Sequence, residues 1–220
     1  MNSAHVGNSP FSAVLLAAGA GSRLGGRAKS LLEIDGVPLI SRLITAMTDA
    51  GASELVVVLG HHADAIQSTL RHLPAATDMR MTVVTNASPD DGQASSLRIG
   101  LAALTHHANA VLIALADQPL IDCADIVDLL RAFKARGDRP MLAPRVAGKP
   151  GNPVLIDATL AALWRSEYGT NTGQLWRRDN PTRIHWFDSN NAHYRIDIDT
   201  PEDMARFTAR TGRSLRWPTD

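Results

Sequence analysis

Short apolar runs rich in β-branched residues alternate with helical patterns along the first half of this chain. The runs are SAVLLA (12–17), ELVVVLG (54–60), MTVVTN (81–86) and AVLIALAD (110–117). Runs of this length, bounded by turn residues, are typical of buried parallel strands covered on both faces. The segments between them repeat apolar residues with a helical period. Strand–helix alternation of this kind predicts an α/β fold.

The pattern changes in the second half. A helix is expected over 125–137, and segment 140–157 then reads as two extended pieces around a Lys-Pro-Gly turn at 149–151. Two short helical stretches and an extended segment over 182–187 follow. We therefore predict one domain spanning 1–220, a Rossmann-like three-layer α/β sandwich whose mostly parallel sheet carries an added antiparallel strand pair.

Composition excludes several classes of protein. Lys and Arg together number 22, as do Asp and Glu, and this balance argues against a protein that coats nucleic acid or an anionic membrane. Cys123 is the one cysteine, so no intrachain disulfide forms, which fits a reducing compartment. The N-terminus does not resemble a signal peptide, and no apolar run reaches the roughly 18 residues that span a bilayer. We expect a cytoplasmic protein that binds neither nucleic acid nor membrane.

A glycine-rich stretch, LLAAGAGSRLGGRAKSLL, follows the first expected strand. It does not match the dinucleotide fingerprint G-x-G-x-x-G, because Gly19 and Gly21 are followed by Leu24 where the third glycine belongs. A nicotinamide or flavin site of the Rossmann type is therefore disfavoured.

The same stretch also departs from the P-loop, G-x-x-x-x-G-K-[ST]. Gly21 and Gly26 have the right spacing, but two residues separate Gly26 from Lys29. The remaining interpretation is a triphosphate loop, in which Arg23 forks onto phosphate oxygens and Lys29 adds a mobile charge. The alternative is a flexible surface loop with solvated cations. The position of this stretch directly after a buried strand favours the triphosphate loop, since open parallel sheets bind ligands at the carboxyl ends of their strands.

Five motifs together resemble a known family. LAAGAGSRLGGRAKSLLEIDGVPLI resembles the first motif of nucleotidyltransferases with a glycosyltransferase-A-like fold, most of all the molybdenum cofactor cytidylyltransferases and their guanylyltransferase relatives. GQASSLRIGL, LADQPLI, GNPVLI and DIDTPEDM extend the resemblance over nearly the whole chain, in the expected order. The resemblance implies a nucleotide-binding part at about 12–118 and an acceptor-binding part, with the antiparallel strand pair, at about 119–211.

Nucleotidyl transfer of this kind needs a divalent metal, Mg²⁺ or alternatively Mn²⁺, and carboxylates that hold it. Asp117 ends an otherwise apolar strand, and the resemblance implies that it binds the metal. For the second ligand we favour Asp199 and keep Asp197 as second choice; both are expected on one face of a strand. Either acid could instead cap the last helix, but Thr200 fits that role, with Pro201 at the first helical position.

The resemblance also implies the remaining site residues. Lys29, Arg23 and Asp117 would be catalytic. Gly151 and Asn152 would line the acceptor pocket, although a tight turn requires the same residue types. The nucleotide-binding residues would be Leu16, Ala17, Ala18, Gly19, Gly21, Arg23, Lys29, Ser95 and Ser96.

The implied reaction joins CMP, taken from CTP, to molybdopterin and releases pyrophosphate. Ala18 at the middle of Ala-Ala-Gly favours CTP, whereas the spacing from Arg23 to Lys29 is more similar to the guanylyl branch. GTP, a sugar phosphate or another small phosphate remain alternatives, as does a nucleotide-binding carrier protein without turnover. A molybdoenzyme or its chaperone is a candidate partner.

The histidines and tryptophans suggest no further site. The pairs 61–62 and 106–107 are adjacent in the chain, and neighbours on a helix or strand do not face one metal. Trp164, Trp176 and Trp186 are expected in the core or at a dimer surface, since no basic stripe accompanies them.

Overall fold

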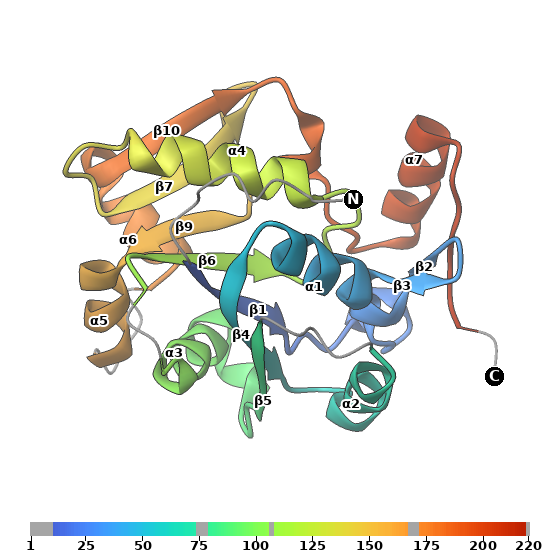
Figure 1. Cartoon of the computed structure of the whole chain (residues 1–220). Coiled ribbons are helices and arrows are strands. Elements are labelled where there is room, and N and C mark those ends of the chain that lie inside the picture. The colour runs from blue at the N-terminus through green and yellow to red at the C-terminus, as the bar shows by residue number, and fades with distance from the viewer. Residues whose placement is uncertain (1–10, 74–78, 106–107, 167–171, 219–220) are drawn as a thin grey trace, which may run out of the picture.

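The computed structural model describes residues 11–73, 79–105, 108–166 and 172–218. Within them the chain forms a mixed eight-stranded sheet with helices on both faces, and a small three-stranded antiparallel sheet (Figure 1). The strands are β1 (Phe11–Ala17), β2 (Glu33–Ile34), β3 (Val37–Pro38), β4 (Ala52–Leu59), β5 (Arg80–Thr85), β6 (Ala110–Leu115), β7 (Met141–Val146), β8 (Lys149–Pro150), β9 (Val154–Asp157), β10 (Ile184–Ser189) and β11 (Leu215–Arg216). The α-helices are α1 (Leu39–Asp49), α2 (Ala63–Arg71), α3 (Gln93–Ala103), α4 (Cys123–Lys134), α5 (Ala158–Ser166), α6 (Gln174–Asp179) and α7 (Pro201–Thr211). The predicted α/β class is confirmed.

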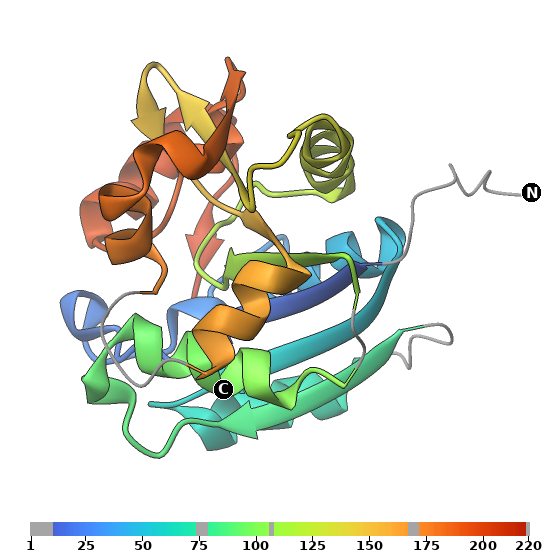
Figure 2. The ribbon, with the colours of Figure 1, turned by 90° about the vertical axis from the view of Figure 1, so that its left-hand side faces the viewer.

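Strand β1 lies at the centre of a parallel block ordered β6-β1-β4-β5. All its residues are buried, and alternate side chains face opposite layers because successive residues of a strand point to opposite faces. Phe11 and Leu15 pack in one core with α1, α2 and α4. Val14 and Leu16 pack in the other with α3, α5 and α6. Figure 2 shows α3 (green) and α5 (orange) side by side on this second face.

Strand β5 departs from the prediction that all four runs are covered on both faces. It ends the sheet and pairs with β4 alone, so its residues are half-buried or exposed. Met81 is 37% exposed, for example. An apolar run does not distinguish a central strand from an edge strand, because both need one buried face.

The added antiparallel strands are confirmed. Strand β9 runs antiparallel between β6 and β7, and β10 then lies parallel to β7 at the other edge. The turn, however, was misplaced: Lys149 and Pro150 form β8, and the chain reverses at Ala147 and Gly148, with φ of 49° and 75°. Positive φ at both central residues is the twist that two-residue hairpins prefer. The predicted Lys-Pro-Gly turn is therefore wrong.

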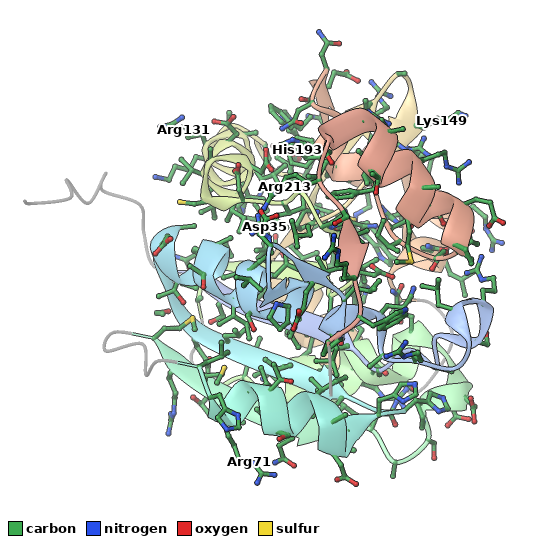
Figure 3. All side chains as sticks on the ribbon, turned by 90° about the vertical axis from the view of Figure 1, so that its right-hand side faces the viewer. Asp35, Arg71, Arg131, Lys149, His193 and Arg213 are labelled. Carbon is green, nitrogen blue, oxygen red and sulfur yellow. The ribbon has the colours of Figure 1, made fainter. Side chains whose placement is uncertain are left out.

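A third apolar cluster holds the C-terminal segment against the glycine-rich loop. It joins Leu24 from the loop to Ile198, Phe207 and Leu215, all of them buried. Two polar contacts border this cluster. Arg213 and Asp35 form an ion pair (Figure 3), and the Arg27 guanidinium lies 4.2 Å from the centre of the Trp217 ring. The C-terminal part of the chain therefore packs beside the carboxyl ends of β1 and β6 (Figure 1).

One expectation falls on residues outside these ranges, that for the histidine pair 106–107. Among the described helices, none is both long and apolar enough to cross a membrane.

Candidate active site

A cleft of about 320 Å³ opens at the carboxyl ends of β1 and β6. This is the edge at which open parallel sheets bind ligands. Residues from five separated segments line it: Leu16, Ala17, Ala18, Gly19, Ala28, Lys29, Ser30, Ile66, Pro89, Gly92, Gln93, Ser96, Leu115, Ala116, Asp117, Asp197 and Asp199. We call it the first cleft.

The glycine-rich loop curls tightly around Gly21. The carbonyl of Gly21 accepts hydrogen bonds from the amides of Leu24 (2.8 Å) and Gly26 (3.0 Å). Gly21 has φ +64°, and a Cβ added there would lie 1.9 Å from the carbonyl oxygen of Arg27. Only glycine fits this position. Leu24, where the dinucleotide fingerprint requires glycine, is instead a core residue at 7% exposure.

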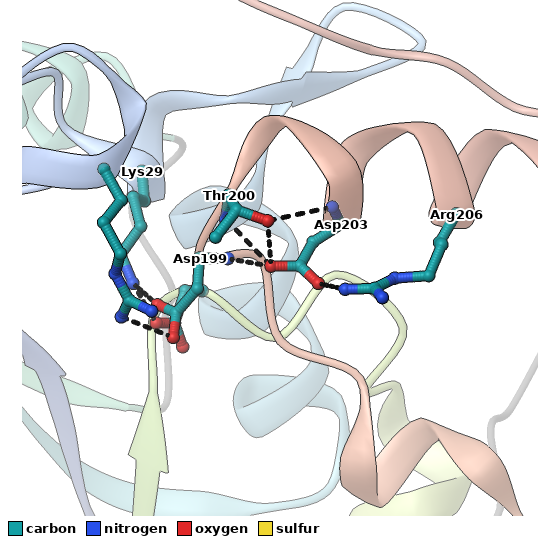
Figure 4. A network of polar contacts seen from close by, with 7 residues as sticks. Lys29, Asp199, Thr200, Asp203 and Arg206 are labelled. Carbon is teal, nitrogen blue, oxygen red and sulfur yellow. Dashed lines mark hydrogen bonds and ion pairs between the residues drawn. The ribbon is translucent and has the colours of Figure 1, made fainter.

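Lysine 29 lies between two carboxylates. Its Nζ is 2.6 Å from Oδ2 of Asp117 and 2.6 Å from Oδ1 of Asp199, and Arg23 donates to Oδ2 of Asp199 at 2.8 Å. Figure 4 shows this group at the start of α7. The structure therefore brings together four residues that the sequence placed in three separate motifs.

Burial and neighbouring charges shift the pKa values of Lys29, Asp197 and Asp199. Burial alone would lower the pKa of Lys29, but Asp117 and Asp199 outweigh it and raise that pKa. Burial alone would raise the pKa of Asp199, but Lys29 and Arg23 hold it below its usual range. Partial burial raises the pKa of Asp197, and the charges of Asp117 and Asp199 raise it further. The cleft thus holds a charged lysine beside an ionised carboxylate.

The donor set fits a divalent cation. Oδ1 of Asp117 is buried and accepts no hydrogen bond from the described residues. Asp197 and Asp199 line the same cleft, and carboxylate oxygens are the ligands that Mg²⁺ and Mn²⁺ accept. A buried carboxylate oxygen without a donor is costly unless a cation satisfies it.

The expected strand around Asp197 and Asp199 is wrong. The segment 196–199 is extended but pairs with no strand of the described chain. It connects a 3₁₀ turn to α7. Ile198 is fully buried between the two acids, and its amide donates to the carbonyl of Asp117 at 3.0 Å. This contact fixes the late acids beside Asp117.

A capping box starts α7 directly after Asp199. Thr200 accepts from the amide of Asp203, and Oδ2 of Asp203 accepts from the amides of Asp199 (3.1 Å) and Thr200 (2.8 Å). The predicted N-cap at Thr200 and first helical residue at Pro201 are confirmed. The cap leaves the side chain of Asp199 available to Lys29 and Arg23 (Figure 4).

The serines at the start of α3 differ in position. Ser96 lines the first cleft, whereas Ser95 is buried outside it and donates to the carbonyl of Gly92. Asn86 holds both hydroxyls, with Nδ2 at 2.8 Å from Ser95 Oγ and 3.0 Å from Ser96 Oγ. Sequence reasoning missed Asn86; the signal available was a polar residue directly after β5, at the same sheet edge as Asp117.

A second cleft of about 540 Å³ adjoins the first and shares Leu115 and Asp197 with it. Gly151 and Asn152, expected on the acceptor side, both line it. Gln118 lines it as well, and its Nε2 donates to the carbonyl of Asn152 at 3.1 Å.

Some expected residues lie beside the clefts without lining either. Gly21 and Ser95 shape the surroundings, and Arg23 reaches the first cleft through Asp199. Among the tryptophans, Trp164 and Trp176 are buried, whereas Trp186 lines the second cleft.

The two adjacent histidines have different partners. His61 Nε2 lies 3.0 Å from Oδ1 of Asp90, whereas His62 Nε2 lies 2.9 Å from the carbonyl of Ala20 and so braces the glycine-rich loop. One further acidic group, Asp122, Asp125 and His193, has metal-like spacing but lines neither cleft. Its acids form the capping box of α4.

Comparisons with known proteins agree with this geometry. A family model described as the MobA-like NTP transferase domain matches residues 13–182. Nicotine blue oxidoreductase of Paenarthrobacter nicotinovorans is 32% identical over 88% of this chain and 94% of that protein. Bifunctional protein GlmU of Sorangium cellulosum is 33% identical over 75% of this chain, but the match covers only 36% of that longer protein.

Solved structures share the fold. Rv0371c of Mycobacterium tuberculosis H37Rv superposes with a TM-score of 0.72 at 23% identity, over 91% of this chain and 98% of that chain. A second structure of that protein, described as a complex with manganese, gives a TM-score of 0.67 at 22% identity, over 90% and 97% of the two chains.

Proposed function

Because this chain belongs to the MobA-like NTP transferase family and is a nucleotidyltransferase, we propose that it transfers CMP from CTP to the phosphate of molybdopterin and releases pyrophosphate. One observation carries the proposal. Lys29 and the acids Asp117 and Asp199 meet in a cleft, and a second cleft opens beside it across Asp197. Two adjoining clefts with charges between them suit two phosphorylated substrates.

The reaction forms one bond and breaks one. A phosphate oxygen of the acceptor attacks the α-phosphorus of the triphosphate, and the bond to the bridging oxygen of the β-phosphate breaks, so that pyrophosphate leaves with the electron pair. In this proposal Lys29 and Arg23 bind phosphate oxygens and offset the charge that develops on them. Ala18 and Gly19 leave room for the nucleotide at the end of β1.

Asp117 would hold Mg²⁺ together with Asp199 or Asp197, and the bound ion would act as a Lewis acid on phosphate oxygens. The unpartnered Oδ1 of Asp117 supports this assignment. Lys29 now neutralises both Asp117 and Asp199, so it would exchange these carboxylates for phosphate when the charged ligands bind.

The proposed reaction is not the oxidoreduction for which one relative is named, because this chain lacks the dinucleotide fingerprint. Leu24 stands at the third glycine position of the dinucleotide fingerprint and is packed in the core. Ala18 lines the first cleft, and alanine at this position, where the guanylyltransferases that the chain resembles more often have glycine, favours CTP over GTP. GTP, and a sugar phosphate or other small phosphate as acceptor, remain the alternatives, and a carrier protein without turnover is the non-enzymatic one.

A pyrophosphate-release assay tests the proposal. CTP, GTP, UTP and ATP are each offered with Mg²⁺ against molybdopterin and against a panel of sugar phosphates. We expect the fastest release with CTP and molybdopterin. Release only with a sugar phosphate would replace the acceptor, release only with GTP would replace the nucleotide, and binding without release under every condition would favour the carrier protein.

A further inference from the structure

The second cleft contains an arginine without an acidic partner in the described part of the chain. Arg177 lines the cleft from α6, and its guanidinium donates to the carbonyl of Gly151 at 3.4 Å. Burial lowers the pKa of Arg177, and no carboxylate of the described residues offsets this effect. The next residue, Arg178, is by contrast exposed and paired with Asp179 at 2.8 Å. A desolvated cation is costly unless an anion joins it.

A second observation, independent of charge, also indicates a ligand in this cleft. Gln118 is 3% exposed and lines the cleft, and its Nε2 donates to Asn152. Its Oε1 is buried and accepts no hydrogen bond from any described residue. Buried amide oxygens are normally satisfied, so this one points to a donor that the described residues do not supply.

Arg177 also lines a small cavity that shares residues with both clefts. Gln93 and Leu115 line this cavity too, and both also line the first cleft. Trp186 lines the second cleft with a half-buried indole, and the Arg145 guanidinium lies 5.4 Å from the centre of its ring. Charge, hydrogen-bond acceptor and aromatic surface thus surround one space.

We propose that Arg177 determines acceptor specificity by binding a phosphate oxygen of a phosphomonoester whose aromatic ring lies against Trp186. The inference rests on the proposed function, because it takes the second cleft as the acceptor site. An arginine forks onto phosphate oxygens and an aromatic ring stacks on an indole, whereas a sugar ring has no π-system for such stacking.

The test measures binding without turnover. 4-Nitrophenyl phosphate is titrated calorimetrically into the protein saturated with Mg²⁺ and the α,β-methylene analogue of CTP, which cannot release pyrophosphate, with ribose 5-phosphate as the non-aromatic probe. We expect the aromatic phosphate to bind at least several-fold more tightly than ribose 5-phosphate. Arg177→Gln should weaken it by about tenfold or more, because a charge-assisted hydrogen bond is lost, and Arg177→Lys should weaken it less.

Arg131→Gln is the matched control, since Arg131 is exposed on α4 (Figure 3) and lines neither cleft. It should change the affinity less than twofold, and CTP affinity should be unchanged in all variants. An Arg177→Gln affinity within twofold of the wild type, or no binding to the wild type at about 10 mM probe, would overturn the inference. Equal affinity for both probes would overturn the aromatic part.

The outcome separates this inference from the proposed function. Arg177-dependent binding of the aromatic phosphate without turnover of molybdopterin would keep the inference and reject the proposed acceptor. Turnover of molybdopterin with an unchanged KM for molybdopterin in Arg177→Gln would keep the proposed function and reject the inference.

Discussion

Lys29 places its ammonium nitrogen 2.6 Å from Oδ2 of Asp117, while Oδ1 of the same carboxylate is buried without a partner among the described residues. One oxygen of Asp117 therefore already faces a cation, and the other is desolvated and free to bind a second one. This arrangement sets Asp117 apart from Asp199, whose two oxygens are both taken by Lys29 and Arg23.

Asp117→Asn should lower the rate of pyrophosphate release by roughly 100-fold or more, because the amide cannot neutralise a metal and leaves Lys29 with one carboxylate fewer. Steady-state kinetics over a range of Mg²⁺ concentrations measure the effect. Asp128→Asn is the control, since Asp128 is exposed on α4 and pairs with Arg131. Unchanged turnover in Asp117→Asn would remove Asp117 from the site.

Gly21→Ala should abolish nucleotide binding, because the added Cβ would lie 1.9 Å from the carbonyl oxygen of Arg27 and the loop would have to open. Gly25→Ala is the matched variant: Gly25 lies in the same loop with φ +71°, yet a Cβ there meets no atom within 4 Å. Both variants carry the cost of positive φ, about 1 kcal/mol, and only the first adds a clash. CTP titration should separate them, and equal affinities would contradict the role of Gly21.

The α/β class, the parallel central strands and the meeting of the loop with Asp117 could be predicted from the sequence. Buried parallel strands need continuous apolar runs, and their carboxyl ends share one edge of the sheet. The cap at Thr200 was equally local, since the hydroxyl, proline and acid of a capping box follow one another in sequence.

The other features of the site could not be predicted, mainly because they depend on contacts between segments that are distant in the sequence. Asn86 serves the site only because β5 ends next to α3, and Arg177 lines the second cleft only because α6 packs against Gly151. Ser95 and Ser96 are neighbours of the same type, and the rotation of about 100° between successive helical residues decides which of them reaches the first cleft. The turn at Ala147 was missed because alanine rarely adopts positive φ.

Leu24→Ala should destabilise the fold and the loop together. The side chain is 7% exposed and packs with Ile198 and Phe207, so its truncation should lower the free energy of unfolding by about 2–4 kcal/mol. Denaturant titration measures this loss, and CTP affinity should fall with it, because Leu24 ties the loop to the segment that bears Asp199. The exposed Leu175→Ala, at 38% exposure, serves as the control and should cost much less. Loss of stability with unchanged CTP affinity would show that the two are not linked.

Asp203→Ala should weaken the start of α7 in a pH-dependent way. Burial alone would raise the pKa of Asp203, but hydrogen bonds from Arg206, Thr200 and the amides of Asp199 and Thr200 hold it below its usual range. A lowered pKa in the folded state means that the ionised carboxylate stabilises the fold fully above the unfolded value, about 3.9, and that this contribution is lost as the pH falls through the folded value. At neutral pH we expect the variant to lose about 1–2 kcal/mol of unfolding free energy, as for other helix caps.

Denaturant titrations of the wild type and Asp203→Ala between pH 3 and 8 test this expectation. The difference in unfolding free energy should be constant from about pH 6 to 8 and should shrink below about pH 4. Glu202→Ala is the matched control, because Glu202 lies in the same helical turn, carries the same charge and is exposed. It keeps the capping box intact and should cost less than about 0.5 kcal/mol. A difference for Asp203→Ala that persists unchanged to pH 3 would mean that the carboxylate acts through its shape and not through its charge.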